Sequence, residues 1–241
     1  MALPKIDTPI YELDLPLSKK RIRFRPFLVK EQRNLLMALE AEDEESIEQN
    51  IKQVLHNCTL TEDVDIEKLP ITDVEFYFLN LRARSVGEIA ENKYKCNNVV
   101  NDKECGNIMD VKVNLLDLSV EVPENISDTI KLTDTMVVKL RYPEFAIVKE
   151  AKDTADISEF AIKMIASSIE YIHDGEQFYY ASESTQEELV QFVDSLNQQQ
   201  FAKMEEFFNN LPKLQKTVQF TCDKCQFAHV IEMEGLNNFF V

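Results

Sequence analysis

Residues 218–233 read VQFTCDKCQFAHVIEM, and this stretch carries the strongest structural signal in the chain. Two cysteines, Cys222 and Cys225, are separated by two residues and lie between segments in which apolar and polar residues alternate. Such alternation predicts β-strands, and a turn of this length between two strands points both sulfur atoms at one spot. The stretch is therefore interpreted as a zinc-knuckle hairpin.

A second cysteine pair lies in the sequence KCNNVVNDKECG at 95–106, where eight residues separate Cys96 from Cys105. A structural zinc ion takes four ligands in a tetrahedron, which neither pair supplies alone. We therefore expect Cys96, Cys105, Cys222 and Cys225 to bind one structural zinc ion. Cys105 precedes Cys222 by 117 positions, so a shared ion would make two distant segments neighbours in the fold.

Two disulfides or free thiols are the alternative to this zinc site, because the eight-residue spacing is less specific than C-x-x-C. His229 is a conceivable fourth ligand if one cysteine does not reach the metal. As the lone histidine of a strand, it is more often a surface side chain. Cys58 follows an apolar helical pattern and is expected to be a buried, unreactive thiol.

The composition favours a protein partner. The 241 residues include 43 Asp and Glu against 26 Lys and Arg, a formal net charge of -17. This charge repels a phosphate backbone and an anionic lipid surface, so nucleic acid and membrane are disfavoured as partners. No apolar run approaches the roughly 20 residues that span a bilayer, and the N-terminus lacks the pattern of a signal peptide. In a reducing cytosol, paired cysteines more often bind metal than form cystine.

The apolar periodicity predicts an α+β fold with an N-terminal hairpin and helices, a β-rich middle and a helical C-terminal part that ends in a zinc-ribbon-like hairpin. The expected elements are a hairpin over 10–27, helices over 28–60 and 72–85, short strands between 94 and 142, and helices over 157–172, 185–196 and 201–211. The expected parts are residues 1–90 (hairpin and helices), 91–150 (strands with the first cysteine pair) and 151–241 (helices with the cysteine hairpin). We expect them to form one compact unit with soft boundaries.

The second strand of the predicted hairpin is basic, with Lys or Arg at 19, 20, 21, 23 and 25. Because these residues alternate with Ile22 and Phe24, we interpret them as the solvent face of a half-buried strand that pairs with nearby acids. A docking site for an acidic partner is the alternative.

No catalytic motif is found. The four glycines are isolated, so no phosphate-binding loop can be assembled, and neither G-x-S-x-G nor H-E-x-x-H occurs. A closed tetrathiolate site also has no open position for water. We therefore expect no catalytic residues, no enzymatic activity and no cofactor other than zinc.

The C-terminal residues resemble a known family. The motifs are FAKMEEFF (201–208), LPKL (211–214), Cys222-x-x-Cys225, Gly235-Leu236 and Phe239-Phe240. Together they resemble the baseplate hub subunits and hub assembly proteins of T-even-type, contractile-tailed bacteriophages. The hairpin over 11–27 and the first cysteine pair fit the same family. Gln226 departs from the pattern, since glycine commonly follows the second cysteine of a knuckle, as Gly106 does after Cys105.

This resemblance implies a non-enzymatic part in building the central hub of the tail baseplate, in the host cytoplasm during assembly, and leaves a place in the virion open. The partners would be other tail and baseplate hub proteins, and a homo-oligomer is also compatible with the sequence. A tail assembly chaperone that shields an apolar segment of another protein is the first alternative. A zinc-ribbon nucleic-acid-binding protein is the second, and the basic strand is its one support.

Overall fold

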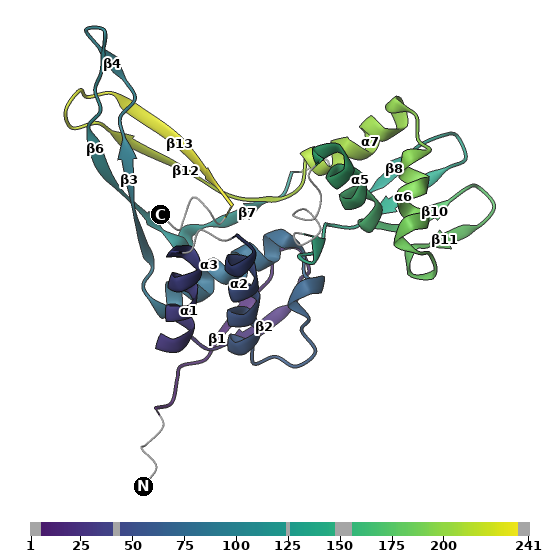
Figure 1. Ribbon diagram of the computed structural model, residues 1–241, viewed down its shortest axis with the longest axis horizontal. Helices are drawn as coiled ribbons and strands as arrows, with labels where there is room; N and C mark the ends of the chain where they lie inside the picture. Colours follow the sequence, from purple (N-terminus) through teal and green to yellow (C-terminus); the bar gives the residue numbers. More distant parts are fainter. Residues whose placement is uncertain (1–5, 41–43, 124–125, 148–155, 236–241) are drawn as a thin grey trace. The chain divides into compact units, whose positions relative to one another are not determined.

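The computed structural model describes residues 6–40, 44–123, 126–147 and 156–235, and confirms a mixed α+β fold (Figure 1). The chain forms two compact units. Unit 1 contains Met1–Ile66, Thr72–Glu121 and Lys213–Val241, and unit 2 contains Glu67–Ile71 and Val122–Pro212. Unit 1 is thus assembled from both ends of the sequence, with unit 2 inserted between them. The three-part organisation by residues 1–90, 91–150 and 151–241 stays a prediction.

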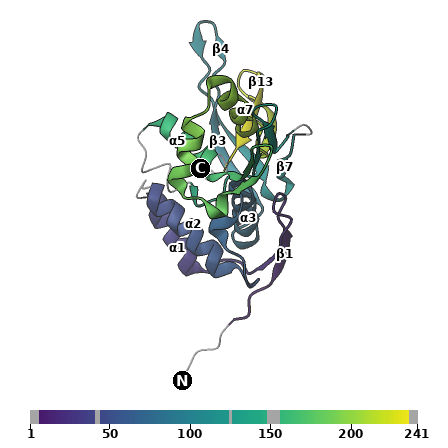
Figure 2. The ribbon, with the colours of Figure 1, turned by 90° about the vertical axis from the view of Figure 1, so that its right-hand side faces the viewer.

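The N-terminal half of unit 1 contains the predicted hairpin and helices. Its elements are β1 (Tyr11–Asp14), β2 (Arg21–Phe24), α1 (Val29–Glu40), α2 (Glu44–Cys58) and α3 (Ile71–Ser85). Figure 2 shows α1 and α2 side by side. The fully buried carboxylate of Asp73 accepts the backbone N–H groups of Leu17 and Ser18 at 2.8 and 2.7 Å, which fixes the hairpin turn to α3. The Phe24 ring packs edge-on against Tyr77 of α3.

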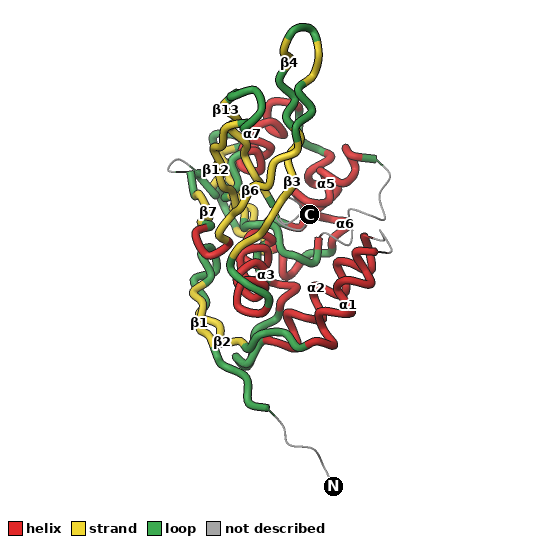
Figure 3. The backbone as a smooth tube through the Cα atoms, turned by 90° about the vertical axis from the view of Figure 1, so that its left-hand side faces the viewer, coloured by secondary structure: helices red, strands yellow, loops and turns green. Residues whose placement is uncertain are grey.

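The remaining strands of unit 1 carry both cysteine pairs. They are β3 (Ile89–Lys95), β4 (Val99–Val100), β5 (Lys103–Glu104), β6 (Ile108–Asn114), β7 (Ser119–Glu121), β12 (Lys213–Thr221) and β13 (Ala228–Glu234). β3 pairs with β6, β12 pairs with both β13 and β7, and all of these pairs are antiparallel. Figure 3 shows β3 and β6 running together towards the small β4–β5 hairpin. Alternate residues such as Ala90, Val113, Leu214 and Met233 face inward and form one core with α3.

Unit 2 has a four-stranded antiparallel sheet in the order β11-β10-β9-β8. Its elements are β8 (Thr129–Lys131), β9 (Val137–Leu140), α5 (Ile157–Ser167), β10 (Ile169–His173), β11 (Phe178–Tyr180), α6 (Gln186–Asp194) and α7 (Gln198–Asn209). Val138 and Ile172 from the sheet share one core with Leu189, Met204 and Phe207 from the helices. Capping boxes at Thr185 and Asn197 begin α6 and α7 by satisfying free N–H groups of the first turn.

Two sequence-based expectations need correction. The helix predicted over 157–172 ends at Ser167, and Ile169 and Ile172 lie on strand β10, where Ile172 pairs with Val138 of β9. β12 begins at Lys213 rather than at Val218, because its first residues pair with β7. The apolar end with Leu236, Phe239 and Phe240 lies outside the described residues. None of the described helices has the length and apolar character needed to cross a membrane.

Candidate metal centre

The two cysteine segments form knuckles with the same backbone hydrogen bonds. In the second knuckle, the N–H of Gln226 donates to the carbonyl of Cys222, and the N–H of Cys222 donates to the carbonyl of Phe227, both at 2.8 Å. In the first knuckle, the N–H of Gly106 donates to the carbonyl of Cys96, and the N–H of Cys96 donates to the carbonyl of Asn107, at 3.0 and 2.7 Å. The first knuckle is therefore a complete knuckle into which the β4–β5 hairpin is inserted.

The residue after the second cysteine has a left-handed backbone in both knuckles. Gly106 has φ +62°, as its position in the sequence predicts, and Gln226 has φ +58°. The departure from glycine at position 226 therefore leaves the turn geometry unchanged. A side chain in this conformation costs free energy that glycine avoids.

The structure brings all four predicted ligands together. The sulfur atoms of Cys96, Cys105, Cys222 and Cys225 all lie within 4.8 Å of one another. Two sulfur–sulfur contacts join different knuckles, at 3.7 Å for Cys96 and Cys225 and at 3.9 Å for Cys105 and Cys222. A tetrahedron with 2.3 Å zinc–sulfur bonds has sulfur–sulfur edges of about 3.8 Å. The two contacts between the knuckles therefore match the edges of a tetrathiolate metal site, and all four sulfur atoms are close enough to share one ion.

Each of the four sulfur atoms also accepts the backbone N–H of the residue two positions later. The donors are Asn98 for Cys96, Asn107 for Cys105, Lys224 for Cys222 and Phe227 for Cys225. Hydrogen bonds to a sulfur atom favour its ionised form, which is the form that binds a metal. The knuckle backbone is thus arranged to stabilise thiolates.

Two asparagines connect the knuckles through their side chains. Asn98 Nδ2 donates to Cys225 Sγ and Asn107 Nδ2 donates to Cys222 Sγ, both at 3.6 Å. Each asparagine thus donates its backbone N–H within its own knuckle and its side chain to the other knuckle. Sequence reasoning missed these residues, although the pattern C-x-N occurs at both cysteines of the first pair.

His229 corrects a further expectation, because it is not a surface side chain. It is 5% exposed, and its ring contacts those of Tyr94, Phe220 and Phe227 at centroid distances of 4.9–5.3 Å. Its Nε2 lies 3.1 Å from Cys96 Sγ, within hydrogen-bonding distance. Alternation along β13 could have revealed this position, since His229 shares the inward face with Met233.

The four thiols differ in acidity. The Asn98 side chain and the backbone N–H of Phe227 lower the pKa of the Cys225 thiol to about 6. Burial raises the pKa of the Cys96 thiol to about 12. A divalent cation would lower the pKa of every thiol that it binds. A bound metal would therefore allow the buried Cys96 thiol to ionise.

The other residues singled out in the sequence lie away from this cluster. Cys58 is fully buried, and its burial raises the pKa of its thiol to about 12, as expected of an unreactive cysteine. On the basic strand, Arg21 pairs with Asp14 at 2.6 Å and Arg25 pairs with Glu31 at 2.8 Å. The prediction that nearby acids pair with this strand is confirmed for Arg21 and Arg25, and the nucleic-acid alternative stays a hypothesis.

Comparison with known proteins identifies the family. The sequence model of the family described as T4 bacteriophage base plate protein matches residues 8–241, which is nearly the whole chain. The chain belongs to this family. This baseplate protein matches no curated protein and no solved structure at a significant level. The family points to a structural rather than an enzymatic role, in the phage tail and in contact with other tail proteins.

Proposed function

We propose that this baseplate protein is a structural or assembly component of the tail baseplate hub, and that one zinc ion bound by Cys96, Cys105, Cys222 and Cys225 stabilises its fold. The family match over residues 8–241 supports the baseplate part of this proposal. The sulfur cluster, with its two knuckles and its hydrogen-bond donors, supports the metal.

Zinc suits the site better than the alternatives. A disulfide needs a sulfur–sulfur distance of about 2.05 Å, whereas Cys96 and Cys225 lie at 3.7 Å, Cys105 and Cys222 lie at 3.9 Å, and all four cysteines are free thiols. Four thiolates in a tetrahedron suit zinc, or iron as the second choice. Four protein ligands leave no open position, so the metal would act on folding and not on a substrate.

Native mass spectrometry of the purified chain tests the metal. We expect one zinc ion per chain, and we expect its loss when Cys222 and Cys225 are replaced together by serine. Cys58→Ala is the matched control, because Cys58 is buried outside the cluster, and it should retain the metal. Iron in place of zinc, or a folded chain without metal that keeps four free thiols, contradicts the proposed zinc site.

Co-expression with the other baseplate proteins of the same phage tests the hub role. A complex that contains the chain together with hub proteins is expected. Detection of the chain in purified mature tails supports a lasting component. A complex found only before tail completion favours the chaperone alternative, and the absence of any complex contradicts both.

A further inference from the structure

The sheet of unit 2 has one face in the core and one aromatic face. Strand alternation places Val138 and Ile172 among the helices. The opposite face carries Tyr171 and His173 from β10 and Phe178 and Tyr180 from β11, which pair as Tyr171 with Tyr180 and His173 with Phe178. We call these four residues the aromatic face. In Figure 1, helices α5, α6 and α7 gather on one side of this sheet.

The four rings of the aromatic face contact one another. Phe178 lies 4.3 Å from His173, 5.2 Å from Tyr171 and 6.1 Å from Tyr180, measured between ring centroids. Even so, Phe178 remains 51% exposed and Tyr180 46% exposed. A cluster of rings that stays half in water is unusual for a surface without a binding role, and aromatic residues are enriched at the centres of protein interfaces.

The same residues lie on an open sheet edge. β11 is the last strand on its side of the sheet and pairs only with β10 among the described strands. Tyr179, whose side chain points to the other face, donates its hydroxyl to Asp174 at 2.9 Å. Within the described part of the chain, the hydroxyls of Tyr171 and Tyr180 make no hydrogen bond, so they are available to a partner.

Charge indicates which partner fits. Between residues 122 and 212 the sequence has 17 Asp and Glu against 7 Lys and Arg. The lysines on the aromatic side of the sheet are already paired, Lys131 with Asp134 and Lys139 with Asp128. By contrast, Glu176 of the β10–β11 turn and Glu183 just after β11 form no ion pair with any described residue, and Glu170 of β10 attracts Lys139 without a direct ion pair. The unpaired charge beside the aromatic face is therefore negative, and it favours a cationic segment.

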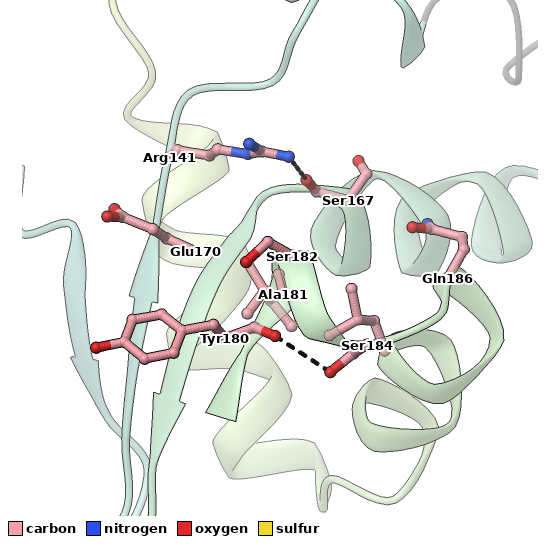
Figure 4. Close-up of a pocket in the computed structure, with 10 residues that line it drawn as sticks. Arg141, Ser167, Glu170, Tyr180, Ala181, Ser182, Ser184 and Gln186 are labelled. Atoms are coloured by element: carbon pink, nitrogen blue, oxygen red, sulfur yellow. Dashed lines mark hydrogen bonds between the residues drawn. The ribbon is translucent and has the colours of Figure 1, made fainter. Parts of the chain in front are cut away.

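A pocket beside β11 is lined both by a ring of the aromatic face and by a carboxylate. Glu170 and Tyr180 line it, with Arg141, Ser182 and Leu189 among the other lining residues, and its volume is about 410 Å³. In Figure 4 the Tyr180 ring and the Glu170 carboxylate project in the same direction, away from Gln186. Arg141 is held by Glu144 and by the carbonyl of Ser167, both at 3.1 Å, so it forms no ion pair with Glu170.

We propose that the aromatic face, together with Glu170, Glu176 and Glu183, is the docking site for an extended, arginine-bearing segment of another baseplate protein. A guanidinium group stacks on tyrosine and phenylalanine rings and forms paired hydrogen bonds with carboxylates. One arginine side chain can therefore bind both the rings of the aromatic face and a carboxylate beside it. An extended segment can also add its backbone to the open edge of β11. This inference rests on the proposed function, because it takes its partner from the baseplate.

The test compares full-length variants co-expressed with the other baseplate proteins of the phage. The first variant, F178S with Y180S, removes the exposed rings. The second, E170Q with E183Q, removes two charges at nearly constant shape. The control, D194N with E205Q, removes two exposed charges of the same unit away from β10 and β11. Circular dichroism and thermal unfolding verify that each variant is folded.

We expect both test variants to lose at least tenfold in the amount of one co-purified baseplate protein, and the control to retain it. Cross-linking to the wild-type chain should then place an arginine-bearing segment of that protein beside β11. The complex with the wild-type chain should also weaken as salt increases, because carboxylates contribute to it.

Three outcomes overturn the inference. If a baseplate protein co-purifies equally with the wild type and with F178S/Y180S, the aromatic face is not its docking site, while the proposed function stands. If the purified chain alone self-associates and this variant abolishes the association, a second copy is the occupant. If the cross-linked segment contains no arginine, the proposed chemistry of the partner is wrong. Failure of the wild type to bind any baseplate protein instead contradicts the proposed function itself.

Discussion

The two knuckles have matching backbones, so opposite substitutions in them test backbone strain at the candidate metal centre. Gly106 and Gln226 occupy the same position and have nearly the same φ, +62° and +58°. A non-glycine residue in this conformation costs roughly 1–2 kcal/mol relative to an ordinary one. The second knuckle, with Gln226, therefore carries this backbone strain, and the first knuckle, with Gly106, does not.

Gly106→Ala should destabilise the protein by about 1 kcal/mol. Steric clash adds nothing to this value, because a Cβ at position 106 would meet only Lys95 Cε, at an ordinary contact distance of 3.8 Å. Gln226→Gly should stabilise it by about 0.5 kcal/mol, because the relief of strain exceeds the entropy that glycine adds to the unfolded chain. The exposed bond from Gln226 Nε2 to the carbonyl of Asp223 contributes little to this balance.

Urea unfolding of the metal-loaded proteins, followed by circular dichroism, measures both changes. Hydrogen exchange of the two knuckles locates the effect. Lys103→Ala, at an exposed position of β5, is the control and should change the free energy of unfolding by less than about 0.5 kcal/mol. If Gly106→Ala is neutral, or if Gln226→Gly destabilises, backbone strain does not govern these turns and the reasoning is refuted.

Three further predictions concern buried polar groups. Asp73→Ala should cost about 3 kcal/mol in urea unfolding and accelerate hydrogen exchange in the β1–β2 turn, because two backbone N–H groups lose their acceptor; normal exchange there would contradict this. Burial acts to raise the pKa of Glu31, but hydrogen bonds from Arg25 and from the backbone N–H of Leu28 outweigh this effect and hold the pKa below its ordinary 4.5. The pair therefore stabilises the fold above about pH 4.5 and less as pH falls through the lowered pKa, and Glu31→Gln should flatten this part of the pH–stability curve. His229→Phe should keep the ring packing yet weaken zinc binding about 10-fold to 100-fold in chelator competition, and unchanged affinity would show that its contact with sulfur is unimportant.

Much of the fold could be predicted because local patterns agree with it. Alternation around Ile22 and Phe24 predicted the first hairpin, and the helix predicted over 185–196 corresponds to α6, which follows the Thr185 capping box. The helix over 157–172 was predicted too long because isoleucines three or four residues apart fit a helix, while Ile169 pairs with Leu140 and Ile172 with Val138, which lie 29 and 34 positions away in the sequence. The start of β12 was missed for the same reason, since β7 supplies its partner.

The geometry of the cysteine cluster was predicted in part. The four cysteines were found from their number and spacing, since two cysteine pairs of this kind are typical of a metal site. Their hydrogen-bond donors were not found, because Asn98 acts across the knuckles on Cys225, and no local pattern reveals a contact between residues 127 positions apart. The β4–β5 hairpin inserted in the first knuckle also lengthens the spacing between Cys96 and Cys105. The sequence therefore does not show that the backbone of this segment forms an ordinary knuckle turn.

The discontinuity of unit 1 determines the order in which the chain can fold during translation. Unit 2 is nearly continuous, and its last residues are synthesised before those of β12 and β13. During this interval the first knuckle has its two thiols but lacks the second knuckle. Release of Cys222 and Cys225 then supplies both the second knuckle and the strand that pairs with β7. Completion of unit 1 is therefore a late event, and a ribosome that stalls within α7 leaves unit 1 without its second pair of thiols.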